Sequence, residues 1–436
     1  MYAEFDEKQV LFVIDSLACG RSRKKPCVTM SSVVVPIYNM EPYLARCIDS
    51  RKKQILIVID SLSCGGAEKS LVSLLPLLEY DKMDVDLLIV KAGGIFESYL
   101  PESVHRISLP AVTGLRKILQ PLCRLALSVS LRLRRMFGME RHGAELHWRA
   151  MNISFAPLKK HYDTAVAYHQ GFPTYYVATK VDADKKIAWI NADISKAGYS
   201  ERFNRPFYDN YCKIAAVSMA LCNMLESTSY VDKAKLCTVY DVLNTELIRQ
   251  MAADDGFDDN LSAGTLRIVT VGRMTPPKNY ALAVETAKRL RDGGLKFRWY
   301  FVGDGSEREN IEKRIEEYGL REYVSLLGMR SNPYPYMSGC DIYVQTSSFE
   351  GFCLTLREAR ILNKPVVSTN FSVVGDQIRD GENGLIAEMT PADLAEKIML
   401  LANDSVLRER LVAATRLEDD RTAFTEAAKV NEMLLA

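Results

Sequence analysis

The stretch that decides the fold is residues 347–359, which read S-S-F-E-G-F-C-L-T-L-R-E-A. An apolar strand pattern follows it at residues 365–369. Glu350 falls in a loop beside a glycine, and Glu358, eight residues later, falls in the helix predicted after that loop. Both carboxylates can therefore point into one cleft. A solvated helix residue and a charge at a helix N-terminus would give the same spacing, so the flanking segments have to decide between these interpretations.

Strand and helix patterns alternate upstream of this stretch. A β-branched run at 266–271 ends in Gly272-Arg273 and leads through a proline-rich turn containing Lys278 into a periodic helix at 280–290. A strand at 299–305, a charged helix at 307–318 and strands at 324–328 and 341–346 follow. Such alternation predicts a doubly wound, mostly parallel sheet, in which ligands bind at the carboxyl ends of the strands. The residues predicted at those ends are Gly272, Arg273, Gly303, Gly328 and Glu350.

The order of these motifs resembles that of a known enzyme family. The motifs are V-G-R followed by K-N, then V-G-D-G, L-L-G, S-S-F-E-G-F with its second Glu, K-P-V-V-S-T and N-G-L-I. This order resembles the donor-binding half of retaining glycosyltransferases of family 4, and it covers residues 265–412 closely and 54–250 more weakly. The resemblance implies an α/β fold of the GT-B type, with two Rossmann-like doubly wound domains facing across a cleft.

When the bond between the sugar and the nucleoside diphosphate breaks, negative charge builds on the leaving phosphate. Fixed cations beside that phosphate therefore lower the activation barrier of the transfer. Arg273 and Lys278 are the predicted cations, the alternative being two surface residues after a strand. By resemblance, Glu350 would contact sugar hydroxyls and Glu358 the ribose hydroxyls. The predicted catalytic residues are Arg273, Lys278 and Glu350. The predicted donor-binding residues are Gly272, Gly303, Arg330 beside the base, Gly351 and Phe352 through their backbone N–H groups, and Glu358.

The expected activity is metal-independent transfer of a hexosyl-type sugar, with retention of configuration, from a nucleotide-sugar donor to a saccharide or polyprenyl-linked acceptor in surface polysaccharide biosynthesis. No cofactor and no metal are expected, because protein cations and helix N-termini would replace the metal; the nucleotide sugar is a co-substrate. A nucleotide-sugar epimerase and a non-catalytic binding module of the same fold, impaired by a disturbed N-terminus, stay as alternatives. A dinucleotide-binding oxidoreductase is disfavoured, because G-G-A-E after the first strand is not G-x-G-x-x-G.

The first 52 residues do not fit this scheme. Residues 8–20 read K-Q-V-L-F-V-I-D-S-L-A-C-G and residues 53–65 read K-Q-I-L-I-V-I-D-S-L-S-C-G, a near duplicate. Between them, residues 31–44 resemble the opening of an inverting family 2 glycosyltransferase of the GT-A type, and that resemblance ends by residue 50. Residues 1–52 are interpreted as an aberrant, truncated or recombined leader.

The amino-terminal domain is predicted at 53–250, as the acceptor side. Its first strand leads through a small-residue loop to a helix at 67–78, and Gly65 and Gly66 would let backbone approach a bound anion at the helix N-terminus. A simple tight turn fits those glycines equally well. Residues 186–195 resemble a family segment that often carries a histidine, but here Asn191 stands in its place, followed by Asp193. An amide can hydrogen-bond a hydroxyl but cannot shuttle a proton as imidazole does.

The other domain boundaries are predicted from the local composition of the sequence. Residues 251–265 are acidic, contain Gly and Ser, lack an apolar period and are the predicted linker. The carboxy-terminal donor-binding domain is predicted at 266–415 and a final helix at 416–436. His161 and His169 are interpreted as packing or surface residues, because neither has a ligand partner in the sequence.

Residues 115–149 carry a local basic signal. Two glutamates, Glu140 and Glu145, oppose eight basic residues: Arg116, Lys117, Arg124, Arg132, Arg134, Arg135, Arg141 and Arg149. Leucines are interleaved with them. Two interpretations fit, a segment that lies on an anionic membrane face and an ordinary domain helix with solvated arginines. The first would suit an acceptor on a polyprenyl lipid.

The composition limits the kinds of protein to which this chain can belong. The 436 residues, of which 48% are hydrophobic and 25% charged, predict a globular two-domain chain. Lys and Arg number 56 against 55 Asp and Glu, so no global charge draws the chain to nucleic acid. The ten cysteines form no C-x-x-C pair and read as reduced thiols. With no apolar run near the ~20 residues that span a bilayer, a cytoplasmic protein is expected, with peripheral contact to the inner membrane face as an option.

Overall fold

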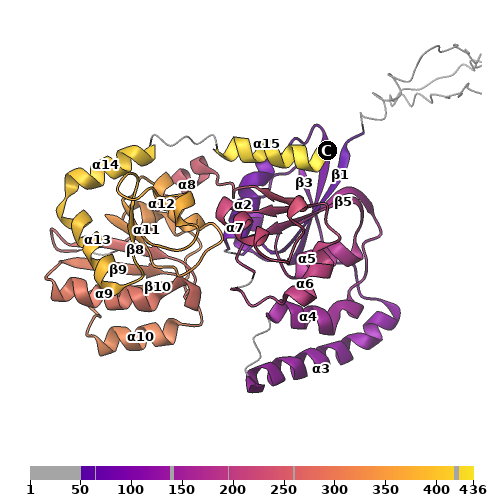
Figure 1. Ribbon diagram of the computed structural model, residues 1–436, viewed down its shortest axis with the longest axis horizontal. Coiled ribbons are helices and arrows are strands. Elements are labelled where there is room, and N and C mark those ends of the chain that lie inside the picture. Colours follow the sequence, from indigo (N-terminus) through magenta and orange to yellow (C-terminus); the bar gives the residue numbers. More distant parts are fainter. Residues whose placement is uncertain (1–50, 64, 138–141, 195, 259–260, 417–421) are drawn as a thin grey trace, which may run out of the picture. The chain divides into compact units, whose positions relative to one another are not determined.

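The computed structural model describes residues 51–436, apart from residues 64, 138–141, 195, 259–260 and 417–421 (Figure 1). The leader expected at 1–52 thus lies outside the described residues, except for its last two. Arg51 pairs with Asp163 at 3.1 Å, and Lys52 pairs with Asp84 at 3.6 Å. Both partners lie in strands of the first sheet, so residues 51 and 52 are held to that sheet by ion pairs.

The first lobe is built on a parallel seven-stranded sheet with the order β3-β2-β1-β4-β5-β6-β7. Its strands are β1 (Lys53–Ser61), β2 (Met83–Lys91), β3 (Val104–Ile107), β4 (His161–Ala167), β5 (Asp182–Ile190), β6 (Lys213–Ala216) and β7 (Leu236–Thr238). Its helices are α2 (Gly66–Leu74), α3 (Gly114–Phe137), α4 (Gly143–Met151), α5 (Phe172–Lys180), α6 (Glu201–Tyr208) and α7 (Met219–Glu226), with the short 3₁₀ helices η1 (Leu75–Leu77), η2 (Ile95–Tyr99), η3 (Asn152–Ser154) and η4 (Lys233–Lys235). Helix α8 (Thr245–Met251) follows β7 in sequence and contacts two helices of the second lobe. The apolar run of β1 is buried because a parallel sheet is covered on both faces.

The second lobe is built on a parallel six-stranded sheet with the order β10-β9-β8-β11-β12-β13. Its strands are β8 (Leu266–Val271), β9 (Phe297–Val302), β10 (Val324–Gly328), β11 (Ile342–Gln345), β12 (Val366–Thr369) and β13 (Leu385–Ala387). Its helices are α9 (Tyr280–Asp292), α10 (Arg308–Glu317), α11 (Tyr334–Ser338), α12 (Leu354–Ile361), α13 (Pro391–Asn403) and α14 (Ser405–Arg416), with the 3₁₀ helices η5 (Pro276–Lys278) and η6 (Val374–Asp376). The prediction of two parallel, Rossmann-like α/β domains is confirmed.

The two faces of the second sheet belong to two different buried clusters. Along β9, Trp299 and Phe301 pack in one cluster with residues of α9, α10 and α13, whereas Tyr300 and Val302 pack in the other with residues of α11 and α12. This alternation follows from the two-residue period of a strand. The cluster on the α11–α12 side also contains the core of the first lobe, so apolar packing is continuous from one lobe to the other on that side.

The helix α15 (Thr422–Leu435) follows the second lobe in sequence but packs on the first (Figure 1). The Asn431 side chain accepts a hydrogen bond from the backbone N–H of Glu79 at 3.1 Å and donates one to the carbonyl of Leu77 at 3.0 Å. The Thr164 hydroxyl of β4 donates to the carbonyl of Leu434 at 3.0 Å. The first lobe is therefore completed by a helix that comes after the whole of the second.

The basic segment expected from the sequence forms α3 and α4, which pack against each other. Helix α3 also contacts η3 and leaves most of its own surface exposed. Among the residues that the structure describes, no helix combines the length and the apolar character needed to cross a bilayer.

Candidate active site

The candidate site lies where the strand order of the second sheet reverses, between β8 and β11. These strands are adjacent and parallel, so the loops that follow them leave from the same edge of the sheet. Two hydrogen bonds tie the loops together, from the Thr346 hydroxyl to the carbonyl of Lys278 at 2.8 Å and from the backbone N–H of Ser348 to the carbonyl of Pro277 at 2.8 Å. The two motifs predicted to share a crevice are thus joined by one side-chain and one backbone hydrogen bond to the loop after β8.

Lys278 and Glu350, both predicted catalytic residues, form an ion pair at this junction. Lys278 Nζ lies 2.5 Å from Glu350 Oε1, and the Ser347 hydroxyl donates to the same oxygen at 2.5 Å. Burial alone would lower the pKa of the Lys278 ammonium, but the adjacent Glu350 carboxylate outweighs burial, and the pKa lies above its ordinary value. The side chains are 21% and 12% exposed, so the pair remains within reach of a ligand.

A buried polar network behind Glu350 fixes its position, and it was not predicted from the sequence. Gln345 Nε2 donates to the Ser347 hydroxyl at 2.6 Å, while its Oε1 accepts from the hydroxyls of Tyr343 at 2.7 Å and Thr355 at 3.2 Å. Gln345 is 1% exposed. The signal available in the sequence was a glutamine at the end of an apolar strand, because a buried amide needs partners on both of its polar atoms.

Arg273, at the end of β8, is the exposed cation of the site. Its guanidinium is close enough to the Lys278 ammonium for the two positive charges to repel each other. None of the hydrogen bonds or ion pairs between described residues neutralises the Arg273 guanidinium. Two cations thus share the loop, and Glu350 pairs with Lys278. An anion arriving beside Arg273 would relieve their mutual repulsion.

The predicted glycines bring three strand ends together. A Cβ on Gly303, whose φ is +148°, would lie 1.9 Å from the carbonyl oxygen of Gly272, so that position requires glycine. The backbone N–H of Gly303 donates to the carbonyl of Gly328 at 2.9 Å. The Tyr280 hydroxyl donates to the carbonyl of Gly272 at 2.9 Å. Arg330, just beyond β10, is exposed, and its guanidinium lies 5.9 Å from the centre of the Tyr336 ring.

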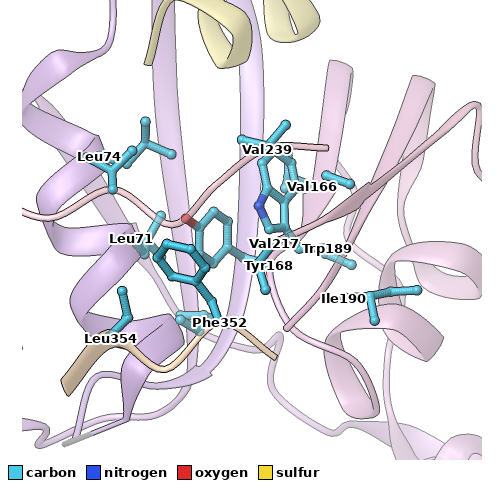
Figure 2. Packing of buried hydrophobic residues seen from close by; sticks show 14 of the residues in the cluster. Leu71, Leu74, Val166, Tyr168, Trp189, Ile190, Val217, Val239, Phe352 and Leu354 are labelled. Atoms are coloured by element: carbon cyan, nitrogen blue, oxygen red, sulfur yellow. The ribbon is translucent and has the colours of Figure 1, made fainter. Parts of the chain in front are cut away.

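The loop after Glu350 meets the first lobe. The Ser218 hydroxyl donates to the carbonyl of Gly351 at 2.8 Å, and a Cβ on Gly351 would lie only 2.0 Å from the carbonyl oxygen of Asn191. Phe352 is 5% exposed, and with Leu354 it packs among first-lobe residues such as Tyr168 (Figure 2). The side chain of Phe352 is thus part of the core, which leaves its backbone as the part that could meet a ligand.

Cys353 follows in a left-handed backbone conformation, with φ +68°. This conformation is costly for a residue with a side chain and tends to persist where function or packing demands it. Burial raises the pKa of the Cys353 thiol to about 12, with a further contribution from Glu350. The thiol is therefore protonated near neutral pH and is a poor nucleophile.

Glu358 is completely buried and is bound to the first lobe. Its Oε1 accepts from Lys69 Nζ of α2 at 2.7 Å and from the Tyr334 hydroxyl at 3.0 Å. Its Oε2 is buried with no hydrogen-bond partner among the described residues. The carboxylate that was expected to accept ribose hydroxyls is therefore held in the structure by a lysine 289 positions earlier in the chain.

The glycine loop of the first lobe contains an anion of its own. Gly65 is the N-cap of α2, and a Cβ placed on it would lie 1.9 Å from Glu68 Oε2. The carboxylate of Glu68 thus folds back over the helix N-terminus, where an anionic ligand was expected from the sequence. Gly66 faces Leu354, whose Cδ1 would lie 3.1 Å from a Cβ at that glycine.

Asn191 and Asp193 are largely engaged within the first lobe. Asn191 Nδ2 donates to the carbonyl of Tyr168 at 3.0 Å, while its Oδ1 is buried without a hydrogen-bond partner among the described residues. Asp193 Oδ1 accepts from the backbone N–H of Lys196 at 3.1 Å. These contacts assign both side chains a part in shaping the loop after β5.

His169, interpreted from the sequence as a packing or surface residue, lies just beyond β4, where the strand order of the first sheet reverses. Its Nδ1 is 2.8 Å from the carbonyl of Gln170 and 3.5 Å from Asp60 Oδ2. Burial alone would lower the pKa of His169, but Asp60 outweighs it, and the pKa is raised. The side chain is 36% exposed. Within the described part of the chain, no group of three or more His, Cys, Asp or Glu side chains is placed to hold a metal ion.

The comparison with family models decides the class of the second lobe. Residues 255–418 match the model described as glycosyl transferases group 1. They form a group 1 glycosyltransferase domain. This domain includes both loops of the candidate site and all of the predicted catalytic and donor-binding residues.

Curated relatives match this chain over part of their length. A poly(ribitol-phosphate) alpha-N-acetylglucosaminyltransferase of Staphylococcus aureus is 36% identical over 141 residues, which are 31% of this chain and 28% of the relative. An N-acetylgalactosamine-N,N'-diacetylbacillosaminyl-diphospho-undecaprenol 4-alpha-N-acetylgalactosaminyltransferase of Campylobacter jejuni is 31% identical over 199 residues, 45% of this chain and 48% of the relative. The matches thus cover about half or less of these relatives.

The similarity to solved structures extends over both lobes. Anabaena HepE, crystallised with UDP and glucose, superimposes with a TM-score of 0.64 at 18% identity and covers 88% of this chain and 99% of its own. At that identity the likeness shows the fold. The group 1 domain is thus the second half of a GT-B architecture.

Proposed function

We propose that the protein is a glycosyltransferase that moves a hexosyl-type sugar from a nucleotide-sugar donor to a saccharide or lipid-linked acceptor in surface polysaccharide or glycolipid biosynthesis. The observation that carries this proposal is the Lys278–Glu350 pair beside the exposed Arg273, at the strand-order reversal of a group 1 domain. Both named relatives transfer N-acetylhexosamines, which supports a hexosyl-type donor.

The proposed chemistry starts from charge. When the bond between the sugar and the leaving phosphate breaks, negative charge collects on the phosphate and positive charge on the sugar. Arg273 is assigned to the phosphate, because its guanidinium is exposed and can bind two oxygens. Lys278 adds a second charge there, while Glu350, fixed by Ser347 and Gln345, is assigned to the sugar hydroxyls. In this assignment the two members of the ion pair face opposite sides of the breaking bond, Lys278 the leaving phosphate and Glu350 the sugar.

The donor-binding roles follow the same geometry. Gly272 and Gly303 place backbone close to the phosphates, Arg330 borders the base, and the backbone of Gly351 and Phe352 meets the sugar or phosphate. Glu358 is assigned to the ribose, where its unpartnered Oε2 would accept a hydroxyl. Gly65, Gly66, Asn191 and Asp193 are assigned to the acceptor side, where they shape the loops. Retention of configuration and independence from metal are parts of this proposal.

The test is a donor screen with the full chain. Purified protein is mixed with UDP-, GDP- and ADP-sugars, and the shift in melting temperature and the release of nucleoside diphosphate are measured. A transferase is expected to bind one nucleotide class, to release its diphosphate slowly in water and to release it faster with a saccharide acceptor. Interconversion of the sugars would assign an epimerase instead. Melting shifts with no release, in the presence of acceptors as well as without them, would leave only a binding module and overturn the proposal.

A further inference from the structure

Helix α3 has one face that packs and another that none of the described residues covers. Its partly buried side chains, Leu119, Cys123 and Leu127, recur every four residues and mark the face that packs on the first lobe. A second set of apolar side chains lies on a different face and is exposed. This set consists of Leu115 (68% exposed), Ile118 (70%), Leu122 (62%), Leu125 (62%), Val129 (46%), Leu133 (41%) and Met136 (75%).

The spacing of this second set is that of one helix face. Its members follow each other at intervals of three or four residues from 115 to 136. Scattered exposed apolar residues are common on protein surfaces, but a continuous stripe along a 24-residue helix marks an interaction surface. We call the residues 115, 118, 122, 125, 129, 133 and 136 the apolar stripe.

The charge of the helix is of one sign. Gly114–Phe137 contains six Lys and Arg residues and no Asp or Glu. Four of the cations, Arg116, Lys117, Arg124 and Arg132, are exposed. Two copies of this helix packed face to face would bring their cations together, which disfavours self-association. The stripe favours a partner with an apolar interior that its side chains can enter. The cations favour a partner with negative charge at its surface.

Two neighbouring elements place further exposed or partly exposed side chains near α3. Ile153, in η3 against α3, is 57% exposed. Lys180, at the end of α5, lies near Arg116, and its pKa is lowered by burial and by that neighbouring charge. Lys159 is exposed beside Leu158, whose backbone N–H donates to the carbonyl of Lys180 at 2.9 Å. An apolar side chain of η3 and a cationic side chain of α5 therefore lie near α3.

We propose that α3 docks the first lobe on an anionic lipid bilayer, with the apolar stripe and Ile153 inserted at the level of the headgroups and with Arg116, Lys117, Arg124 and Lys180 against the lipid phosphates. The proposal rests on this surface and does not depend on the proposed transferase activity. An interfacial helix of this kind combines a buried apolar face with cations that stay near the phosphates. Each apolar side chain that leaves water and each cation near the surface adds to the affinity.

The experiment measures binding of the full chain to vesicles. Sedimentation is compared for vesicles of equal parts phosphatidylglycerol and phosphatidylcholine and for vesicles of phosphatidylcholine alone. Binding is expected to the anionic vesicles, at least about tenfold stronger than to the neutral ones, and to weaken as salt is added. The double variant Ile118→Glu with Leu125→Glu, and separately Lys117→Glu with Arg124→Glu, should each lose about tenfold or more of the partition coefficient.

The matched control places the same charges on exposed apolar residues elsewhere. Val406 on α14 is 74% exposed and Phe424 on α15 is 66% exposed, and Val406→Glu with Phe424→Glu should bind as the wild type does. If a stripe variant fails to fold, Leu122→Trp supplies a second measurement, because its fluorescence should shift to the blue with anionic vesicles, whereas that of Phe424→Trp should not.

Several results would overturn the proposal. Failure to bind anionic vesicles, equal binding to both vesicle types, or wild-type binding by the stripe variants would each do so. A dimer in solution that Ile118→Glu with Leu125→Glu dissociates, without vesicle binding, would assign the stripe to self-association instead. None of these results bears on nucleoside diphosphate release, so a failed docking proposal and a failed transferase proposal can be told apart.

Discussion

Lys69 Nζ lies 2.7 Å from Glu358 Oε1 and joins α2 of the first lobe to α12 of the second. The lysine side chain is 13% exposed and the glutamate side chain is not exposed at all. The ammonium also lies 5.0 Å from the centre of the Tyr334 ring, whose hydroxyl donates to the same carboxylate oxygen. Because Glu358 is also the residue assigned to the ribose, a bound nucleotide and Lys69 would act on a single carboxylate.

Removing the lysine should destabilise the protein strongly. Lys69→Met leaves a buried carboxylate without its cation, and the loss of one partner of a buried pair costs about 3–5 kcal/mol. Urea unfolding measures it. Lys82→Met is the control, because Lys82 pairs with Glu79 at the surface, where the two side chains are 57% and 39% exposed, and an exposed pair contributes at most about 1 kcal/mol. Equal losses in the two variants would contradict the importance of the buried pair.

Arg273→Ala should reduce turnover even at saturating donor. The guanidinium is assigned to charge that develops as the bond breaks, and removing such a group costs on the order of a hundredfold in kcat. Steady-state rates with a donor identified by the screen measure it. Arg289→Ala, on the exposed side of α9, serves as control and should keep the wild-type rate. A change in KM alone would assign Arg273 to ground-state binding.

Gly351→Ala should disturb the contact between the loop after β11 and the loop after β5. The added Cβ would lie 2.0 Å from the carbonyl oxygen of Asn191, so one backbone must move, at a cost of about 1–3 kcal/mol. The melting temperature and nucleotide affinity should both fall. Gly375→Ala makes the same chemical change where no atom of the described residues lies within 4 Å of the added Cβ, and it should alter neither. If both alanine variants behave alike, the close approach at Gly351 has no energetic consequence.

Asp241 should make stability depend on pH. It is 6% exposed, and burial raises its pKa from 3.8 to about 7. Between these values the folded protein holds a proton that the unfolded chain has lost, so the stabilising proton is present at low pH and is lost as the pH rises through about 7. Asp241→Asn should therefore gain stability relative to the wild type as the pH rises from about 5 to 8, by up to about 3 kcal/mol. Urea unfolding at several pH values measures the difference, and a difference that stays constant with pH would refute this prediction.

The architecture could be predicted from local patterns. The apolar runs, the glycine turns and the periodic helices of the second lobe fix strands and helices within a few residues, as at β12, expected at 365–369 and found at Val366–Thr369. The helix expected at 67–78 is divided, since α2 ends at Leu74 and η1 contains Pro76. The final helix, expected from 416, is described as α15 from Thr422, while Arg416 ends α14.

The candidate site could be predicted only in part. Lys278 and Glu350 are joined because β8 and β11 are adjacent, which follows from the alternation of elements. Lys69 is different, because no periodicity links a lysine of α2 to a glutamate of α12. The supporting role of Gln345 was equally hidden, since a hydrogen-bond network depends on which side chains the completed fold brings together.

Helix α15 carries a consequence for how the chain is made. Ala427, Val430 and Leu434 are at most 2% exposed and belong to the core of the first lobe. A ribosome delivers that lobe's sheet long before it delivers these residues. The first lobe therefore emerges with an apolar surface that stays exposed to solvent, and open to aggregation, until the entire second lobe has been synthesised.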